Sequence, residues 1–236
     1  MERLIRMIIL CLYRLPGYFL KLSFYGKHAD EFSDEVRYQM IRRMAKPVCK
    51  AGRITVDVHG LQNIPKEQGY MLYPNHQGMF DVIAMFCGFS DPFSVVYKKE
   101  LQNVILIKHA FKMLKAKAID RGDLRQSMKV INEVAEEVKK GRNYVIFAEG
   151  TRNRDKNNVH TFKPGSFKIA MKSKCPVVPV AQIDMYKALD DKGTSPITVQ
   201  IHVLPPIKYE EYKDMTTGEL AEKVQKQIAD TIKKYE

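Results

Sequence analysis

The chain has 236 residues, 45% of them hydrophobic, which suits one α/β domain or one domain with a helical appendage. A total of 39 Lys and Arg against 27 Asp and Glu gives a net charge of +12 at pH 7, which favours anionic lipid, nucleic acid or acidic partners. The four cysteines lie far apart without a Cys-x-x-Cys pair, so the sequence indicates neither a zinc site nor a disulfide framework, and a reducing cytosol fits best.

The first 26 residues, MERLIRMIILCLYRLPGYFLKLSFYG, are typical of an amphipathic helix in a membrane interface. On a 3.6-residue period, a narrow basic stripe of Arg3, Arg6, Arg14 and Lys21 faces an apolar side of Ile5, Ile8, Leu12, Leu15 and Phe19. The longest uncharged stretch is too short to span a bilayer, and no signal-peptide cleavage site follows. Pro16 and Gly17 should kink or split the helix. The alternative is a helix packed on its own domain.

Strand and helix patterns then alternate along the chain. A second helix is expected from Asp30 to Met44, ending before Pro47. The expected strands are RITVDVHG, GYMLY, FSVVYK, AKAI, NYVIFA, PVVPVAQI and ITVQIHVL, and further helices are expected at about 80–86, 101–114, 123–141, 166–174 and from 217. Asp123 and Gln126 are spaced as a helix-capping pair. The alternation predicts an α/β fold with a central mixed, largely parallel sheet covered by helices.

Three polar clusters follow three of the predicted strands. Asn75 and His76 follow MLY, Asp120 and Arg121 follow AKAI, and residues 149–152 follow YVIFA. In open α/β sheets, ligands bind outside the carboxyl ends of the strands. Turn and cap chemistry would explain any one cluster by itself. Three clusters at equivalent places favour one functional site.

The first cluster predicts a general base. Five residues of continuous helix would place His76 and Asp81 on different faces. If His76 lies in a turn and the helix begins only near Met79, Asp81 can reach back to one nitrogen of the imidazole ring. The carboxylate would then fix the tautomer of the ring and stabilise its charged form, which leaves the other nitrogen to take a proton.

The remaining motifs limit what such a base acts on. The sequence has no Gly-x-Ser-x-Gly elbow, no cysteine next to His76 and no nucleotide-binding glycine loop, so no covalent nucleophile or nucleotide site is visible. Arg121 and Arg152 are suited to a phosphate, because the guanidinium fork matches its oxygens and stays charged. The expected acceptor is a phosphate-bearing alcohol that the base deprotonates.

Four motifs, over roughly residues 53–205, resemble those of the 1-acylglycerol-3-phosphate acyltransferases of phospholipid synthesis. NHQGMFD at 75–81 resembles the first motif, IDR at 119–121 the second, FAEGTR at 147–152 the third and VVPVA at 177–181 the fourth. Two positions depart from the family pattern. Ala148 replaces the usual proline of the third motif, and no glycine precedes the second motif in KAKAIDR.

The resemblance implies acyl transfer from a thioester of coenzyme A or acyl-carrier protein to the 2-hydroxyl of lysophosphatidate, giving phosphatidate. It implies His76 as the base and Asp81 as its partner, with no metal or redox cofactor. The expected substrate-binding residues are Asn75, Lys98, Arg121, Glu149, Gly150, Thr151 and Arg152. The backbone N–H of Gly150 or the ammonium of Lys98 could stabilise the tetrahedral intermediate, and a solvated surface role for Lys98 is equally compatible with the sequence.

With this resemblance, residues 1–50 are expected to form an N-terminal helical membrane-associating segment and residues 51–236 the acyltransferase catalytic domain. The expected location is the cytoplasmic face of a membrane, peripheral or monotopic, with an anionic membrane surface and no nucleic acid as partner. The alternatives are transfer to another lysophospholipid, a metallohydrolase with His76, Asp81 and Glu149 around one ion, and a basic nucleic-acid-binding protein.

Overall fold

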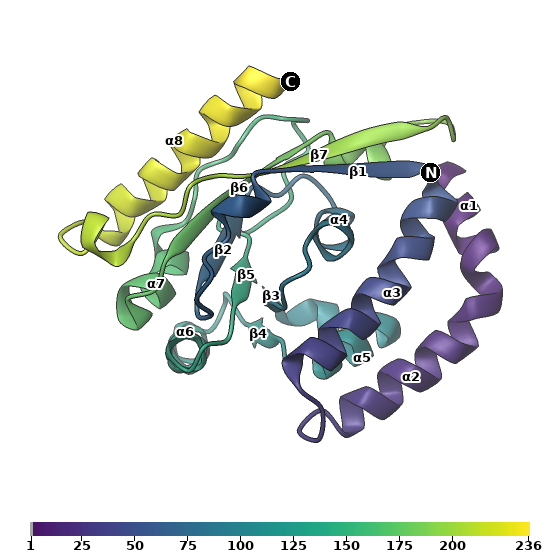
Figure 1. The fold of residues 1–236 in the computed structure, drawn as a ribbon, viewed down its shortest axis with the longest axis horizontal. Helices are drawn as coiled ribbons and strands as arrows, with labels where there is room; N and C mark the ends of the chain where they lie inside the picture. Colours follow the sequence, from purple (N-terminus) through teal and green to yellow (C-terminus); the bar gives the residue numbers. More distant parts are fainter. Residues whose placement is uncertain (1) are drawn as a thin grey trace.

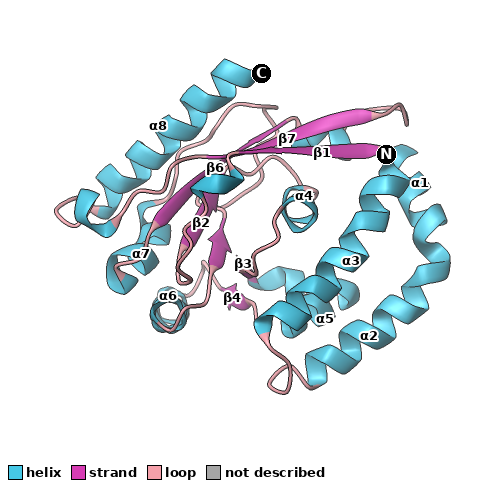
Figure 2. Ribbon diagram, viewed as in Figure 1, coloured by secondary structure: helices cyan, strands magenta, loops and turns pink. Residues whose placement is uncertain are grey.

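Seven strands form one sheet in the order β1-β7-β6-β2-β5-β3-β4 (Figure 2). The computed structural model describes residues 2–236. The strands are β1 (Ile54–His59), β2 (Met71–Pro74), β3 (Ser94–Lys98), β4 (Lys117–Ile119), β5 (Tyr144–Ile146), β6 (Val177–Ile183) and β7 (Ile197–Val203). All neighbouring strands are parallel except β6 and β7, which are antiparallel. The predicted mixed, largely parallel α/β sheet is therefore confirmed.

Helices cover both faces of the sheet (Figure 1). The helices are α1 (Glu2–Cys11), α2 (Leu15–Lys27), α3 (Asp34–Gly52), α4 (Asp81–Gly88), α5 (Ile105–Met113), α6 (Leu124–Lys139), α7 (Lys168–Ser173) and α8 (Thr217–Tyr235). The first five pack into a core on one face, and α6, α7 and α8 pack into a second core on the other. Strands β2, β5 and β6 are buried along their whole length, which explains why they read as continuous apolar runs.

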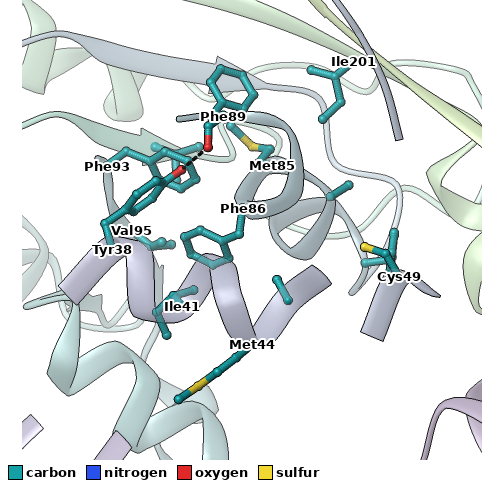
Figure 3. Packing of buried hydrophobic residues seen from close by; sticks show 14 of the residues in the cluster. Tyr38, Ile41, Met44, Cys49, Met85, Phe86, Phe89, Phe93, Val95 and Ile201 are labelled. Atoms are coloured by element: carbon teal, nitrogen blue, oxygen red, sulfur yellow. Dashed lines mark hydrogen bonds between the residues drawn. The ribbon is translucent and has the colours of Figure 1, made fainter. Parts of the chain in front are cut away.

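Aromatic packing joins α3 to α4 in the first core (Figure 3). The ring of Tyr38 contacts Phe86 and Phe93 edge-on, with ring centroids 5.8 and 5.1 Å away, and Phe86 stacks on Phe93 at 5.0 Å. The hydroxyl of Tyr38 donates a hydrogen bond to the carbonyl of Phe89 at 3.4 Å. Because α4 begins at Asp81, this packing holds the helix that carries the predicted carboxylate.

The N-terminal helix is split, as Pro16 and Gly17 predicted. A 3-10 turn at Leu12–Arg14 separates α1 from α2, and Pro16 occupies the first turn of α2, where its missing N–H leaves no helical bond unmade. By length and composition alone, the run Glu2–Lys27 is sufficient to cross a membrane. The sequence argument rested on the longest uncharged stretch, whereas the whole run, with its basic residues included, has the length that a span needs.

The first two residues of the basic stripe, Arg3 and Arg6, face the protein, whereas Lys21 is exposed to solvent. The buried guanidinium of Arg3 donates to the carbonyls of Gly52 at 2.7 Å and Ser195 at 2.8 Å, and Arg6 donates to Ala51 at 3.0 Å. Two of these carbonyls end α3, where the helix leaves unpaired acceptors and the negative end of its dipole. The exposed residues of this segment are mostly apolar, and the large ones are Leu4, Ile5, Ile8, Ile9, Leu10, Leu12, Tyr13, Phe19, Leu20 and Phe24.

Two helix boundaries differ from the sequence expectation. Helix α3 begins at a Ser33 cap and continues through Pro47 to Gly52, because packing against α1 and α4 offsets the hydrogen bond that proline cannot make. The expected helix at 101–114 is a 3-10 segment, Lys99–Asn103, followed by α5. The proposed boundary at residue 50 falls in the last turn of α3, and the first core contains residues from both sides of it.

Candidate active site

The sheet topology brings the three polar clusters to one edge. Strands β2, β5, β3 and β4 are parallel neighbours, so their carboxyl ends lie side by side. The loop after β2 begins with Asn75 and His76, the loop after β5 contains residues 147–152, and Asp120 and Arg121 follow β4. Hydrogen bonds and close contacts join these loops, as described below. The prediction that the clusters meet is confirmed.

His76 and Asp81 form the predicted pair. The ring nitrogen Nδ1 of His76 lies 2.7 Å from Oδ2 of Asp81. The Asp81 side chain is fully buried, and its two oxygens also accept the backbone N–H groups of Gln77 at 2.7 Å and Gly78 at 2.9 Å. The helix begins at Asp81 itself rather than near Met79. Because Nδ1 is occupied, Nε2 is the nitrogen of His76 that can exchange a proton with a substrate.

Glu149 holds the His76 loop against the loop after β5. Its buried carboxylate accepts the backbone N–H of His76 at 2.7 Å and that of His160 at 3.3 Å. Burial raises the pKa of Glu149 to about 7, although the two N–H groups act in the opposite direction. The N–H of Asn153 donates to the carbonyl of His76 at 2.7 Å. Both oxygens of Glu149 are thus used within the protein, where they hold the loop that carries His76. The expected contact of Glu149 with substrate does not follow from this geometry.

Asn75 also has a structural position. It is fully buried, its side-chain oxygen accepts the N–H of Gln182 at 2.7 Å, and its amide donates to the carbonyl of Gln182 at 2.9 Å. The side chain thus extends the pairing of β2 with β6 beyond the strand end. The expected substrate contact of Asn75 is not supported by this geometry, since a substrate would have to displace both bonds.

The second and third motifs meet at Gly150. Gly150 has a φ of +80°, and a Cβ placed on it would lie 3.2 Å from Nη1 of Arg121. Arg121, Thr151 and Arg152 are exposed at this edge, so their side chains are accessible from solvent. Arg121 is therefore beside the third motif, as a shared phosphate site requires.

Neither expected donor for the tetrahedral intermediate is free. The N–H of Gly150 donates to the carbonyl of Phe147 at 3.1 Å within a turn. The ammonium of Lys98 forms an exposed ion pair with Glu100 at 3.0 Å. Both roles toward the intermediate stay predictions, and each requires the donor to leave its present partner, Phe147 for the N–H and Glu100 for the ammonium.

Three further residues at the site escaped the sequence reading. Phe147 packs its ring against that of His76, with centroids 4.2 Å apart. The buried Gln77 donates to Asn157 at 2.9 Å and accepts the N–H of Met185 at 2.7 Å, which ties the His76 loop to the end of β6. Lys163 lies over Gly150. Phe147 and Gln77 lie inside the quoted motifs, but nothing in their spacing distinguishes them from ordinary core residues.

The side chains required by the metallohydrolase alternative do not form a ligand set. Within residues 2–236, no group of three or more His, Cys, Asp and Glu side chains is placed to hold a metal ion. Asp81 and Glu149 direct their oxygens to backbone N–H groups of the His76 loop. These acids support the histidine, and a role for them as ligands would require their release from that loop.

A histidine paired with a buried aspartate lies at the carboxyl edge of a largely parallel sheet, and an exposed arginine follows a neighbouring strand. This arrangement suits general-base chemistry on an anionic acceptor. The chain belongs to the acyltransferase family: the family model described as Acyltransferase matches residues 55–183. The matched residues include all four motifs.

The similar proteins described here are all named 1-acyl-sn-glycerol-3-phosphate acyltransferases. The chain is 30% identical over 161 residues to 1-acyl-sn-glycerol-3-phosphate acyltransferase alpha of Mus musculus, covering 66% of this chain and 56% of that protein. It is 28% identical over 200 residues to the 1-acyl-sn-glycerol-3-phosphate acyltransferase of Borreliella burgdorferi, covering 82% of this chain and 79% of that one. The match to the Saccharomyces cerevisiae enzyme covers 60% of its length, so the chain spans less than two thirds of the mouse and yeast relatives.

The fold is also that of a solved structure. The crystal structure of the 1-acyl-sn-glycerophosphate (LPA) acyltransferase, PlsC, from Thermotoga maritima superimposes with a TM-score of 0.75 and 24% sequence identity. The superposition covers 100% of this chain and 99% of that one. The shared architecture therefore includes the N-terminal helices as well as the sheet.

Proposed function

We propose that this protein is a 1-acylglycerol-3-phosphate O-acyltransferase. It transfers a fatty acyl chain from a thioester of acyl-carrier protein or coenzyme A to the 2-hydroxyl of lysophosphatidate and produces phosphatidate. The observation that carries the proposal is the 2.7 Å contact between Nδ1 of His76 and the buried carboxylate of Asp81, within the first of four family motifs. The names of the relatives support the acceptor.

The proposed chemistry uses groups of this chain and no metal or redox cofactor. Nε2 of His76 takes the proton of the acceptor hydroxyl as the hydroxyl oxygen attacks the thioester carbonyl. The tetrahedral intermediate collapses, the carbon–sulfur bond breaks, and the proton passes from His76 to the leaving thiolate. Asp81 stabilises the imidazolium between these two transfers, because its charge faces Nδ1 throughout.

The membrane is the proposed location, at its cytoplasmic face. The exposed side of α1 and α2 presents ten large apolar side chains, and soluble surfaces rarely expose a contiguous apolar patch of this kind. An acceptor with one long acyl chain resides in the bilayer, so an enzyme lying in the same leaflet gains access to it. An anionic surface is the proposed partner, although Arg3 and Arg6 bind carbonyls and contribute little to that attraction.

The decisive experiment offers the purified protein lysophosphatidate with acyl-carrier-protein and coenzyme A thioesters separately and measures phosphatidate. Turnover with either thioester supports the proposal and identifies the donor. His76→Ala, which deletes the base, should abolish turnover while thermal unfolding stays close to that of the wild type. Wild-type turnover of the variant would contradict the mechanism, and no phosphatidate with either thioester would contradict the proposed acceptor.

A further inference from the structure

Lys163 lies at the junction of the second and third motifs. A Cβ placed on Gly150 would lie 3.0 Å from Cε of Lys163 and 3.2 Å from Nη1 of Arg121. Two cationic side chains therefore approach the same bare backbone position. The φ of +80° at Gly150 favours glycine, and the absence of a side chain lets both Lys163 and Arg121 approach its backbone closely. We call this group of Gly150, Lys163 and Arg121 the cradle.

The backbone holds Lys163 firmly in this place. Its N–H donates to the carbonyl of Ala148 at 2.9 Å, and its carbonyl accepts the N–H of Ser166 at 3.0 Å. Phe162 and Phe167 on either side of it are buried in the second core. With its neighbours anchored inward, Lys163 is directed outward over the third motif, and its side chain is exposed to solvent.

The two cations of the cradle lack an acid partner of their own. Within residues 2–236, neither Arg121 nor Lys163 takes part in an ion pair. The acid whose charge acts on Arg121 is Glu100, and its carboxylate is paired with Lys98 at 3.0 Å. Neighbouring like charges repel, and the attraction of both cations to a bound anion would offset that repulsion. An unpaired pair of cations beside a catalytic base is thus arranged for an anionic substrate group.

We propose that Lys163 is a specificity-determining residue that binds the phosphate of the acceptor together with Arg121 above Gly150. This inference rests on the proposed function, because it assigns one further residue to the acceptor site. The arginine supplies a planar fork and the lysine a mobile point charge, a combination that suits the several oxygens of a phosphate monoester. Lys163 would favour a phosphate-bearing acceptor over a neutral monoacylglycerol.

The test compares Lys163→Met and Lys163→Arg with Lys172→Met. Lys172 is an exposed lysine of α7 that forms no ion pair among residues 2–236, so it matches Lys163 in charge and exposure. We expect Lys163→Met to raise KM for lysophosphatidate about tenfold, with kcat and KM for the thioester near wild type, since charge-assisted hydrogen bonds contribute roughly this much. Lys163→Arg should retain most of the affinity, and Lys172→Met all of it.

Titration with glycerol 3-phosphate makes the test independent of turnover. Lys163→Met should weaken its binding about tenfold, in line with the same charge-assisted bond, and Lys172→Met should not. Unchanged KM and unchanged binding in a folded Lys163→Met would overturn the inference while the proposed function stands. A rise in KM for the coenzyme A thioester alone would also overturn it. If the wild type makes no phosphatidate, the proposed function fails, and the titration still decides the role of Lys163.

Discussion

Two buried carboxylates support His76 in different ways. Asp81 lies within hydrogen-bond distance of the ring nitrogen Nδ1 and accepts two backbone N–H groups at the start of α4. Glu149 accepts only backbone N–H groups, and burial raises its pKa to about 7. The first residue acts on the charge of the imidazole, and the second acts on the position of the loop that carries it.

Asp81→Asn should lower kcat by about 10²- to 10⁴-fold and leave KM for both substrates nearly unchanged. The asparagine has no charge with which to stabilise the imidazolium. In either orientation, its NH₂ group replaces an oxygen that now accepts a backbone N–H, so that N–H loses its acceptor. Steady-state kinetics with lysophosphatidate and thioester measure the effect. Loss of activity no greater than twofold would show that the carboxylate does not support the base.

Glu149 gives the folded protein a pH-dependent free energy of unfolding. Its folded pKa of about 7 lies above the ordinary 4.5, so the ionised side chain destabilises the folded state. This cost is absent below about pH 4.5, grows as the pH rises towards 7 and is complete above it. Glu149→Gln removes the ionisable group and with it this pH dependence. The glutamine has one acceptor oxygen instead of two, so one backbone N–H loses its acceptor.

We therefore expect Glu149→Gln to be less stable than the wild type near pH 5 and to approach it in stability towards pH 8. Urea unfolding of both proteins at several pH values measures the difference. A pH-independent difference would show that Glu149 has an ordinary pKa in the folded protein. Activity should fall at every pH, because glutamine has one acceptor oxygen for the two backbone N–H groups, of His76 and His160, that the two oxygens of Glu149 accept.

At the scale of elements, α1 is attached to the domain by a buried arginine. The guanidinium of Arg3 bonds the carbonyls of Gly52, at the end of α3, and Ser195, next to β7, and so ties three segments together. The amphipathic pattern of the sequence is real, but its polar side is the docking side. Unpaired carbonyls at the end of a helix attract a guanidinium, so a basic residue in an amphipathic helix need not face an anionic surface.

Arg3→Met should lower the free energy of unfolding by about 1 to 3 kcal/mol, because it leaves the buried carbonyl of Gly52 without its donor and removes the bond to the exposed Ser195. Lys21→Met, a change of the same kind at an exposed position of α2, should have little effect. Denaturant unfolding monitored by circular dichroism measures both. Equal stability of the two variants would mean that the Arg3 contacts do not hold α1 on the domain.

At the scale of the whole molecule, the N-terminal helices belong to the core and also present an apolar surface. Met7, Cys11 and Leu22 are buried with residues of α3 and α5, so deletion of residues 1–25 would remove part of the core. Substitutions on the exposed side test membrane binding without this damage. Ile9 and Leu20 are 63% and 67% exposed and are the best positions for them.

Ile9→Glu combined with Leu20→Glu should reduce sedimentation with anionic vesicles at least tenfold and slow turnover of long-chain lysophosphatidate, because two charges would enter the apolar phase. A short-chain soluble acceptor should be processed as before. Leu61→Glu, an exposed leucine outside this surface, is the matched control. Equal binding by all three proteins would remove the membrane-anchor proposal, and detergent should release the wild type more fully than salt.

Local patterns in the sequence predicted the elements of this fold well. Alternating or continuous apolar runs predicted the strands, and Asp123 does cap α6 by accepting the N–H of Gln126 at 3.0 Å. The side chain of Gln126, however, bonds Asp120 and Ala118, so only half of the predicted capping pair exists. The predicted stop before Pro47 failed because neighbouring helices, which the local sequence does not reveal, hold α3 in place.

The sequence by itself determined the α/β fold, the split of the N-terminal helix and the residues of the His76–Asp81 pair, because these depend on neighbours a few positions away. Only the tertiary structure decided which side of α1 faces the domain, that Asn75, Glu149 and Gly150 use their polar groups within the protein, and that Lys163 stands beside Arg121. Hydrogen-bond partners far away in the chain, such as Gly52 and Ser195 at 49 and 192 positions from Arg3, leave no periodic trace in the sequence. A polar side chain in a motif therefore looks the same whether it binds substrate or backbone, and the fold determines which it does.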